Sequence, residues 1–98
     1  MLDLRQLKSF RAVVRLKNFN RAAAELGYSQ PTITQQIQAL ERELGAPLIE
    51  RSRFSRELVL TEAGRCVFDY AEKLLALAEE TKAAARASVT AHSMAGVA

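Results

Sequence analysis

Residues 30–44, QPTITQQIQALEREL, place amide, hydroxyl and guanidinium groups on one side of a predicted helix. At about 100° per residue, the apolar side chains fall in a narrow arc made of Ile33, Ile37, Leu40 and Leu44. The opposite face has no acidic residue, and it carries Pro31, Gln35, Gln38 and Arg42, with Thr34 on one flank and Thr32 and Ala39 on the other. These groups match the donor and acceptor edges of bases in the major groove, glutamine suiting adenine and arginine suiting guanine or phosphate. The alternative is an ordinary solvated helix face.

A tight turn joins this helix to a predicted helix before it, and this arrangement favours DNA binding over an ordinary solvated face. Asn20 has a short side chain that can accept hydrogen bonds from free amides, so we expect it to cap a helix that ends at Gly27. Phe19, just before that cap, is expected to pack back onto the helix. Ser29 is expected to cap the next helix, with Pro31 in its first turn, where no backbone donor is needed. Two short helices joined in this way are typical of a helix-turn-helix.

The elements around this unit must hold it in place. Apolar residues at helical spacing predict a first helix over residues 4–17, capped by Asp3, which serves as core scaffold. Gly45 is expected to end the predicted helix of residues 30–44, which we call the reading helix. Two short apolar runs follow, at residues 48–49 and 58–60, and they predict the two strands of a hairpin, or wing.

The predicted wing carries three arginines, Arg51, Arg53 and Arg56. Arginines beside a recognition helix suit phosphates or a narrow minor groove, where the negative potential is enhanced. Glu50 and Glu57 could pair with them instead. We expect at least one of the three arginines to contact DNA.

The last predicted helix runs from Thr61 to about Ser88, which is too long to cover so small a domain. It carries two neighbouring stripes: one of Val67, Tyr70, Leu74, Leu77, Thr81 and Ala84, and one of Phe68, Ala71, Leu75 and Ala78. One stripe can pack on the helix-turn-helix core, and the other can pack on a second copy of the same helix. The alternative is a single helix that wraps its own domain. Residues 89–98 lack periodicity and are expected to be a flexible tail or the start of a hinge.

Composition and charge agree with a small helical DNA-binding protein. The chain has 98 residues, 49% apolar content and only 6% aromatic content, which suit one compact helical domain. The net charge is +3, but residues 1–40 hold six basic and two acidic residues, a balance of +4. From Cys66 onward three basic residues face four acidic ones. Positive charge concentrated in residues 1–40 fits a surface that faces phosphates.

Several classes of protein are disfavoured. No apolar run approaches the roughly 18 residues that a membrane span needs, and we expect no secretory leader. The single cysteine, Cys66, is expected to be buried, excludes an internal disulfide and fits the reducing cytoplasm. One cysteine and His92 are too few ligands for a metal site. We find no glycine-rich phosphate loop and no nucleophile beside a base, so we expect neither a catalytic residue nor an enzyme.

From Leu4 to Gly64 the sequence resembles the N-terminal DNA-binding domain of the LysR-type bacterial transcriptional regulators. The resemblance is carried, in the right order, by LRQLKSF, an AA pair, SQP, LERELG and LTEAG, and it covers about two-thirds of the chain. It implies a mainly α fold: a winged helix-turn-helix at residues 1–60, with a three-helix core and a two-stranded wing. It also implies dimerisation through a long antiparallel helix at residues 61–88.

The resemblance implies roles for individual residues. Base contacts are expected from Gln30, Pro31, Thr32 and Gln35, and backbone contacts from Asn20, Arg21, Ser29, Thr34, Gln38 and Arg42. Many family members have arginine where this chain has Gln35. The glutamine should shift the base preference from guanine toward adenine. The wing is about two residues longer than the common form, so either Arg53 or Arg56 could take the family's wing-arginine role. The dimer interface is expected to include Val67, Tyr70, Leu74, Leu77 and Thr81.

The expected partners follow from these roles. They are double-stranded DNA with palindromic half-sites and a second copy of the chain, with a tetramer open to the full-length protein. Such regulators normally carry a larger C-terminal effector domain, so we expect a fragment or a truncated regulator, without a cofactor or inducer site of its own. Two alternatives stay open. One is a protein-interaction module that uses the long amphipathic helix, and the other is a winged-helix regulator of another family.

Overall fold

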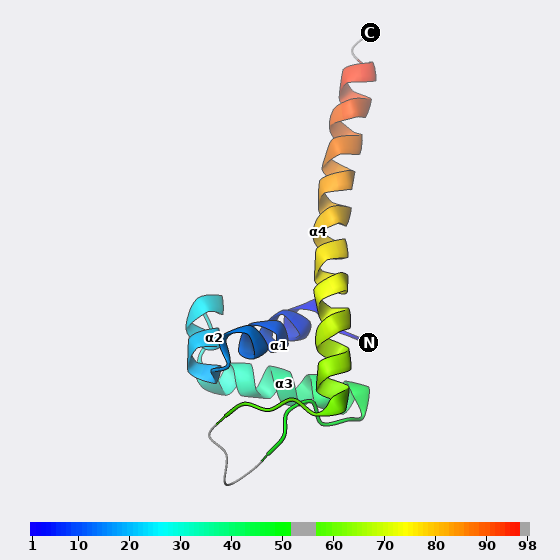
Figure 1. Cartoon of the computed structure of the whole chain (residues 1–98). Helices are drawn as coiled ribbons and strands as arrows, with labels where there is room; N and C mark the ends of the chain where they lie inside the picture. The colour runs from blue at the N-terminus through cyan, green and yellow to red at the C-terminus, as the bar shows by residue number, and fades with distance from the viewer. Residues whose placement is uncertain (52–56, 97–98) are drawn as a thin grey trace.

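The computed structural model describes residues 1–51 and 57–96, and it describes side chains in the last helix as far as residue 90. Four helices are formed there: α1 (Leu4–Leu16), α2 (Phe19–Leu26), α3 (Gln30–Leu44) and α4 (Glu62–Gly96). The first three helices and the foot of α4 form a compact head, from which the rest of α4 extends as a single rod (Figure 1). The molecule is consequently elongated, 68 Å in its longest direction and 25 and 19 Å in the others.

α1 begins at the predicted cap. The Asp3 carboxylate accepts a hydrogen bond from the backbone N–H of Arg5 at 2.8 Å and from its guanidinium at 3.2 Å. The side-chain hydrogen bond from Arg5 is the main cause that holds the pKa of Asp3 below its usual value, and the backbone N–H adds to it. The helix ends one residue earlier than predicted, because Lys17 takes a left-handed conformation with φ 53°.

The start of α2 corrects two predictions. Its cap is Asn18, whose side-chain oxygen accepts from the backbone N–H of Arg21 at 2.9 Å, so Asn20 is not the cap. Phe19 is the first helical residue and packs half-buried on the core instead of preceding the cap. Both asparagines have the right side chain. The position of the turn, set by the left-handed Lys17, decides which of them is extended at the helix start.

The tight turn between α2 and α3 is confirmed. Gly27 ends α2 in a left-handed conformation with φ 76°, which glycine adopts without steric cost. The hydroxyl of Ser29 accepts from the backbone N–H of Thr32 at 3.3 Å and caps α3, with Pro31 in the first turn. α3 ends at Gly45, again as predicted. The reading helix is therefore fixed at both ends by local sequence.

The core lies where the four helices meet. α1 and α3 bury large apolar side chains there, while the fully buried residues of α2 are alanines, which let it approach closely. The buried set is Leu7, Phe10, Ala12 and Val13 from α1, Ala22 and Ala23 from α2, Ile33, Ile37 and Leu40 from α3, and Leu48, Ile49, Ala71 and Leu75. Leu44 was predicted to join the apolar anchor of α3, but its side chain is 36% exposed. The anchor thus ends at Leu40, one turn before the helix does.

The wing is described only near its base. Ile49 and Leu60 form an antiparallel bridge, flanked by hydrogen bonds from the Glu50 N–H to the Val59 carbonyl at 2.8 Å and from the Thr61 N–H to the Leu48 carbonyl at 3.0 Å. The predicted pairing of the two apolar runs is confirmed at this bridge, which is the extent of pairing among the described residues. Arg53 and Arg56 lie outside the described residues.

α4 is longer than predicted. It begins after Thr61, whose hydroxyl accepts from the Gly64 N–H at 2.9 Å and donates to the Pro47 carbonyl at 2.6 Å. It continues to Gly96, so the expected end near Ser88 and the aperiodic tail after it are wrong for residues 89–96. The reason is intrinsic propensity. No glycine or proline interrupts residues 65–95, and alanine, the best helix former, is frequent there.

Cys66 is exposed, which corrects the expected burial. Cys66 lies on the side of α4 that turns away from the head, whereas Gly64, Phe68 and Ala71 face the head. In the described part of the chain, no helix is long and apolar enough to cross a membrane.

Candidate nucleic-acid interface

The outer face of α3 is polar and exposed, as predicted. Gln35, Gln38 and Arg42 are exposed, whereas Ile33, Ile37 and Leu40 are each at most 1% exposed. At the start of the helix Gln30 and Pro31 are exposed, and Thr32 and Thr34 are half-buried. The buried arc therefore fixes which way the amides and the guanidinium point, and leaves them free to meet an external surface.

Hydrogen bonds among polar residues order the first turn of α3. The hydroxyls of Ser29 and Thr32 lie 2.9 Å apart, and the Gln30 amide donates to the Thr34 hydroxyl at 3.0 Å. These bonds join side chains that the sequence assigned to base or backbone contact, and they limit rotamer freedom before any partner binds. Gln35 makes no such bond within the described part of the chain, so its carboxamide is available to a partner.

A cleft of about 830 Å³ joins the start of α2 to the base of the wing. Its walls include Lys17, Asn20, Gln30 and Arg51, from four different parts of the head. Because Asn18 takes the capping role, the amide of Asn20 is free to line this cleft, and Arg21 beside it is exposed. Lys17 was not among the predicted site residues. A lysine directly after the last turn of a helix is only a weak sequence signal for a DNA contact. It gains meaning once the left-handed conformation of Lys17 is known.

A second groove of about 590 Å³ runs along the end of α3 to the wing base, and Gln38, Arg42 and Arg51 line it. Arg51 donates to Glu41 Oε1 at 3.2 Å, and Glu41 Oε2 accepts from the Leu48 N–H at 2.7 Å. The sequence offered Glu50 and Glu57 as partners of the wing arginines and missed Glu41. One carboxylate at the end of α3 thus holds both the backbone and an arginine of the wing base.

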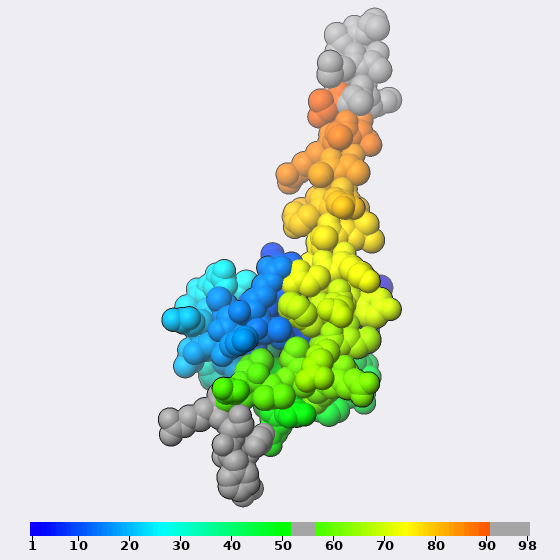
Figure 2. Space-filling view, in the orientation of Figure 1, coloured from blue at the N-terminus to red at the C-terminus, as the bar shows by residue number. Residues whose placement is uncertain are grey.

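The two stripes of α4 are separated by the head. Ala71 and Leu75 are buried and Phe68 is half-buried against the core, so the second stripe is the one that packs. The first stripe begins at Val67, which is half-buried against the head, and then turns outward: Tyr70 is 59%, Leu74 37% and Leu77 57% exposed, and Thr81 is exposed. Figure 2 shows the upper part of α4 standing clear of the head.

An ion pair fixes the lower part of α4 to the head. The guanidinium of Arg15 on α1 donates to both carboxylate oxygens of Glu72, at 3.0 and 2.6 Å. A separate apolar hollow of about 320 Å³ is formed where α1, α3 and α4 meet, lined by Leu2, Leu7, Leu44, Val67, Tyr70, Ala71 and Leu74. The exposed stripe of α4 is therefore continuous with an apolar hollow at its foot. Over residues 1–51 and 57–96, no three His, Cys, Asp or Glu side chains gather in a way that could hold a metal ion.

Comparison with known proteins agrees with this geometry. Residues 4–65 match the family model for the bacterial regulatory helix-turn-helix protein, lysR family. A probable cat1 operon transcriptional activator of Acinetobacter lwoffii is 47% identical over 85 residues, which are 87% of this chain and 27% of that protein. The transcriptional regulator BudR of Raoultella terrigena is 48% identical over 89 residues, or 87% of this chain and 30% of that protein. The chain thus spans less than a third of the length of these relatives.

Solved structures that resemble the chain include DNA complexes. The DNA-binding domain of BenM, in complex with benA site 1 DNA, has a TM-score of 0.81 and 39% identity, covering 87% of this chain and 93% of that one. The DNA-binding domain of CbnR, also in complex with DNA, has a TM-score of 0.82 and 43% identity, covering 90% and 99%. The chain therefore belongs to the lysR family of bacterial regulatory helix-turn-helix proteins, and it is a DNA-binding transcription regulator domain rather than an enzyme.

Proposed function

We propose that the chain reads double-stranded DNA as a homodimer, with one α3 in the major groove of each half-site of a palindromic operator. The observation that carries this proposal is the outer face of α3, which holds exposed amides and a guanidinium opposite a fully buried apolar arc. The DNA complexes of the similar BenM and CbnR domains support it. The positive balance of residues 1–40 supplies the attraction to phosphate that does not depend on sequence.

The polar residues then divide into two groups. Gln30, Pro31, Thr32 and Gln35, at the start of α3, contact base edges, while Asn20, Arg21, Ser29, Thr34, Gln38 and Arg42 contact the backbone and set the register. Arg51, Arg53 and Arg56 of the wing bind phosphates or the minor groove. In the cleft that it shares with Asn20 and Arg51, Lys17 adds a basic group beside the base of the wing.

The second copy docks on the exposed stripe of α4. Because Ala71 and Leu75 already pack on the head, Tyr70, Leu74 and Leu77 face outward and keep 59%, 37% and 57% of their surface exposed. Pairing two α4 helices buries these side chains and places two heads at a fixed separation, which suits a symmetric operator. For the whole protein, we propose action on DNA in the cytoplasm and a small-molecule inducer that binds a domain outside this chain. A tetramer stays open to the full-length protein.

Selection of bound duplexes from a random pool tests the proposal. The wild-type chain should recover a motif with two inverted half-sites whose centres are spaced for two α3 helices on one face of the duplex. Recovery of duplexes without any shared motif would contradict sequence-specific binding.

Gln35→Ala should weaken binding to the selected duplex by about 1–3 kcal/mol and change random-duplex binding little, because a lost base contact affects only the cognate sequence. Fluorescence anisotropy with both duplexes measures this. Gln38→Ala, the same change one turn along the same face, is the matched control and should weaken both duplexes alike. Equal losses for Gln35→Ala would reassign Gln35 to the backbone.

Arg42→Ala should weaken every duplex and reduce the slope of log affinity against log salt by about 1, because one phosphate contact is lost. Arg42 has no ion pair within the described residues, so no internal partner is left unpaired by the change. Arg86→Ala removes the same charge from the exposed rod of α4 and should leave the slope unaltered. A slope that Arg42→Ala does not change would take this residue out of the interface.

A further inference from the structure

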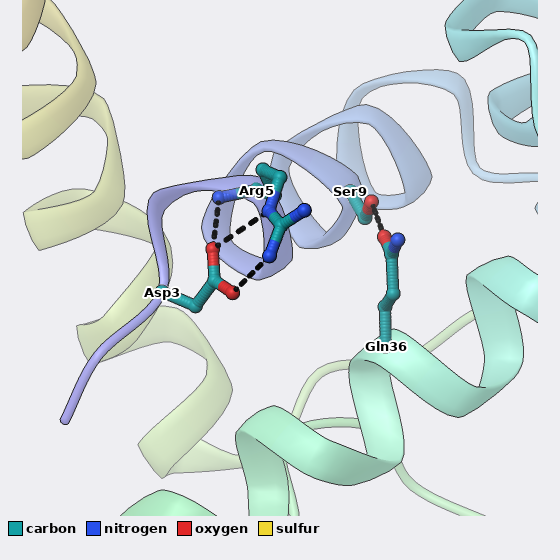
Figure 3. Close-up of polar contacts among 4 residues, drawn as sticks. All are labelled: Asp3, Arg5, Ser9 and Gln36. Atoms are coloured by element: carbon teal, nitrogen blue, oxygen red, sulfur yellow. Dashed lines mark hydrogen bonds and ion pairs between the residues drawn. The ribbon is translucent and has the colours of Figure 1, made fainter.

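One hydrogen bond inside the head joins the scaffold helix to the reading helix. Ser9 of α1 is 0% exposed. Among the residues that the structure describes, it is the one polar residue in the buried class. Its hydroxyl donates to the side-chain oxygen of Gln36 on α3, as Figure 3 shows. Gln36 is half-buried and points from α3 toward α1, away from the outer polar face of that helix. Neither residue is placed to touch DNA.

This bond differs in kind from the other contacts of α3 with the core. Ile33, Ile37 and Leu40 are held by apolar packing, which is not directional and tolerates small rotations of the helix. A hydrogen bond weakens steeply with angle and distance. A buried hydroxyl that loses its partner also leaves a desolvated polar group unsatisfied. The Ser9 hydroxyl therefore restricts the rotation of α3 about its own axis more sharply than the apolar side chains do.

Small rotations of α3 matter for base contacts. A helix with its side chains has a radius of about 5–6 Å, so a rotation of about 10° moves a side-chain tip by about 1 Å. The distances of good hydrogen bonds span only about 0.5 Å. Gln35 is the neighbour of Gln36 in sequence and lies about 100° around the same helix. Any rotation that the Ser9 bond prevents would otherwise displace the Gln35 carboxamide relative to a base edge.

We propose that Ser9 and Gln36 are positioning residues that set the rotation of α3, and that they thereby determine how strongly the chain distinguishes its operator from other DNA. The inference rests on the proposed function, because it concerns the same reading helix. It adds two residues that no contact with DNA would reveal, one of them fully buried on a different helix.

The test measures discrimination as well as affinity. The probes are the duplex recovered by the wild-type chain from a random pool and a random-sequence duplex of equal length, both titrated by anisotropy. Ser9→Ala should lower the ratio of the two affinities about fivefold to tenfold, the size expected for one hydrogen bond, with random-duplex binding unchanged. Gln36→Met removes the acceptor at a half-buried position and should lower the ratio to the same extent.

Two comparisons separate positioning from general stability. Val13→Ala loosens the same core from the same helix without touching the bond, so it should lower the melting temperature and leave the ratio unchanged. In the Gln36→Met background, Ser9→Ala should have no further effect on the ratio, because both changes remove one bond.

The outcomes are distinct. A Ser9→Ala chain with a lower melting temperature but an unchanged ratio would overturn the inference, as would an equal fall of the ratio in Val13→Ala. A wild-type chain without any preference between the two duplexes would instead overturn the proposed function.

Discussion

Gly64→Ala is expected to destabilise the folded chain by roughly 3 kcal/mol, the upper part of the usual range for overpacking. Gly64 lies in the first turn of α4, and a Cβ built there would stand 2.0 Å from the carbonyl oxygen of Leu48 and 3.0 Å from its carbonyl carbon. The obstacle is backbone, so no change of rotamer can relieve the clash. Urea unfolding followed by circular dichroism measures the loss.

The backbone that opposes Gly64 is held on several sides. The Leu48 carbonyl accepts from the Thr61 N–H at 3.0 Å, and the Leu48 N–H donates to Glu41 at 2.7 Å. The hydroxyl of Thr61 also donates to the Pro47 carbonyl at 2.6 Å. A shift large enough to admit a methyl group would break bonds that join α3, the wing base and α4. We therefore expect loss of stability and not local adjustment.

Gly45→Ala is the matched control. Nothing lies within 4 Å of a Cβ at Gly45, but its φ is +70°, so the cost there is conformational, about 1–2 kcal/mol. Gly45→Asn should cost less, since asparagine tolerates the left-handed region better. If Gly64→Ala proved no more harmful than Gly45→Ala, the close approach of α4 to Leu48 would be refuted.

The helix boundaries show what local sequence can predict in this fold. Ser29, Gly27 and Gly45 behave as predicted, because capping depends on residue type and on neighbours within one turn. Asn18 and Asn20 have the same side chain, and only the path of the chain after α1 decides between them. The far end of α4 is set by the absence of helix breakers, because no glycine or proline stands between Gly64 and Gly96.

The limits of periodicity explain the errors in burial. Leu44 continues the apolar arc of α3, yet the arc does not reveal where the neighbouring helices stop covering it. Cys66 is a residue type that is usually buried, and its exposure depends on how α4 is rotated against the head. The exposed polar face of α3 was predictable because it is the complement of a strong apolar arc.

Contacts between distant residues account for what the sequence did not reveal about the site. The Glu41–Arg51 pair joins α3 to the wing base, and the Ser9–Gln36 bond joins α1 to α3. Nothing in the spacing of these residues couples them, since each pair forms only when the helices are packed. Lys17 likewise becomes a candidate for DNA contact only because the turn after α1 faces the wing base.

Leu77→Glu is expected to convert the proposed dimer into monomers and to weaken binding to a duplex with two half-sites about 100-fold or more. Leu77 is 57% exposed on the stripe it shares with Tyr70 and Leu74, and it has no role in the core of the single chain. A buried, unpaired carboxylate in an apolar helix pair is strongly disfavoured. Loss of the second head removes the gain in affinity that comes from simultaneous binding, which is typically about 10²–10⁴-fold.

Ala76→Glu provides the control for Leu77→Glu. Ala76 is exposed on α4 next to Leu77, but on the side of the helix that turns away from Tyr70 and Leu74, so the same charge is added outside the stripe. Sedimentation equilibrium should show dimers for the wild type and Ala76→Glu, and monomers for Leu77→Glu.

Duplexes with one half-site complete the comparison. Because a single head still carries an intact α3, Leu77→Glu should bind a one-half-site duplex as the wild-type monomer does, while losing the advantage of the two-half-site duplex. A Leu77→Glu chain that stays dimeric would show that the exposed stripe of α4 is not the interface between copies. A monomer that binds both duplexes as the wild type does would show that pairing of the heads is not needed for recognition.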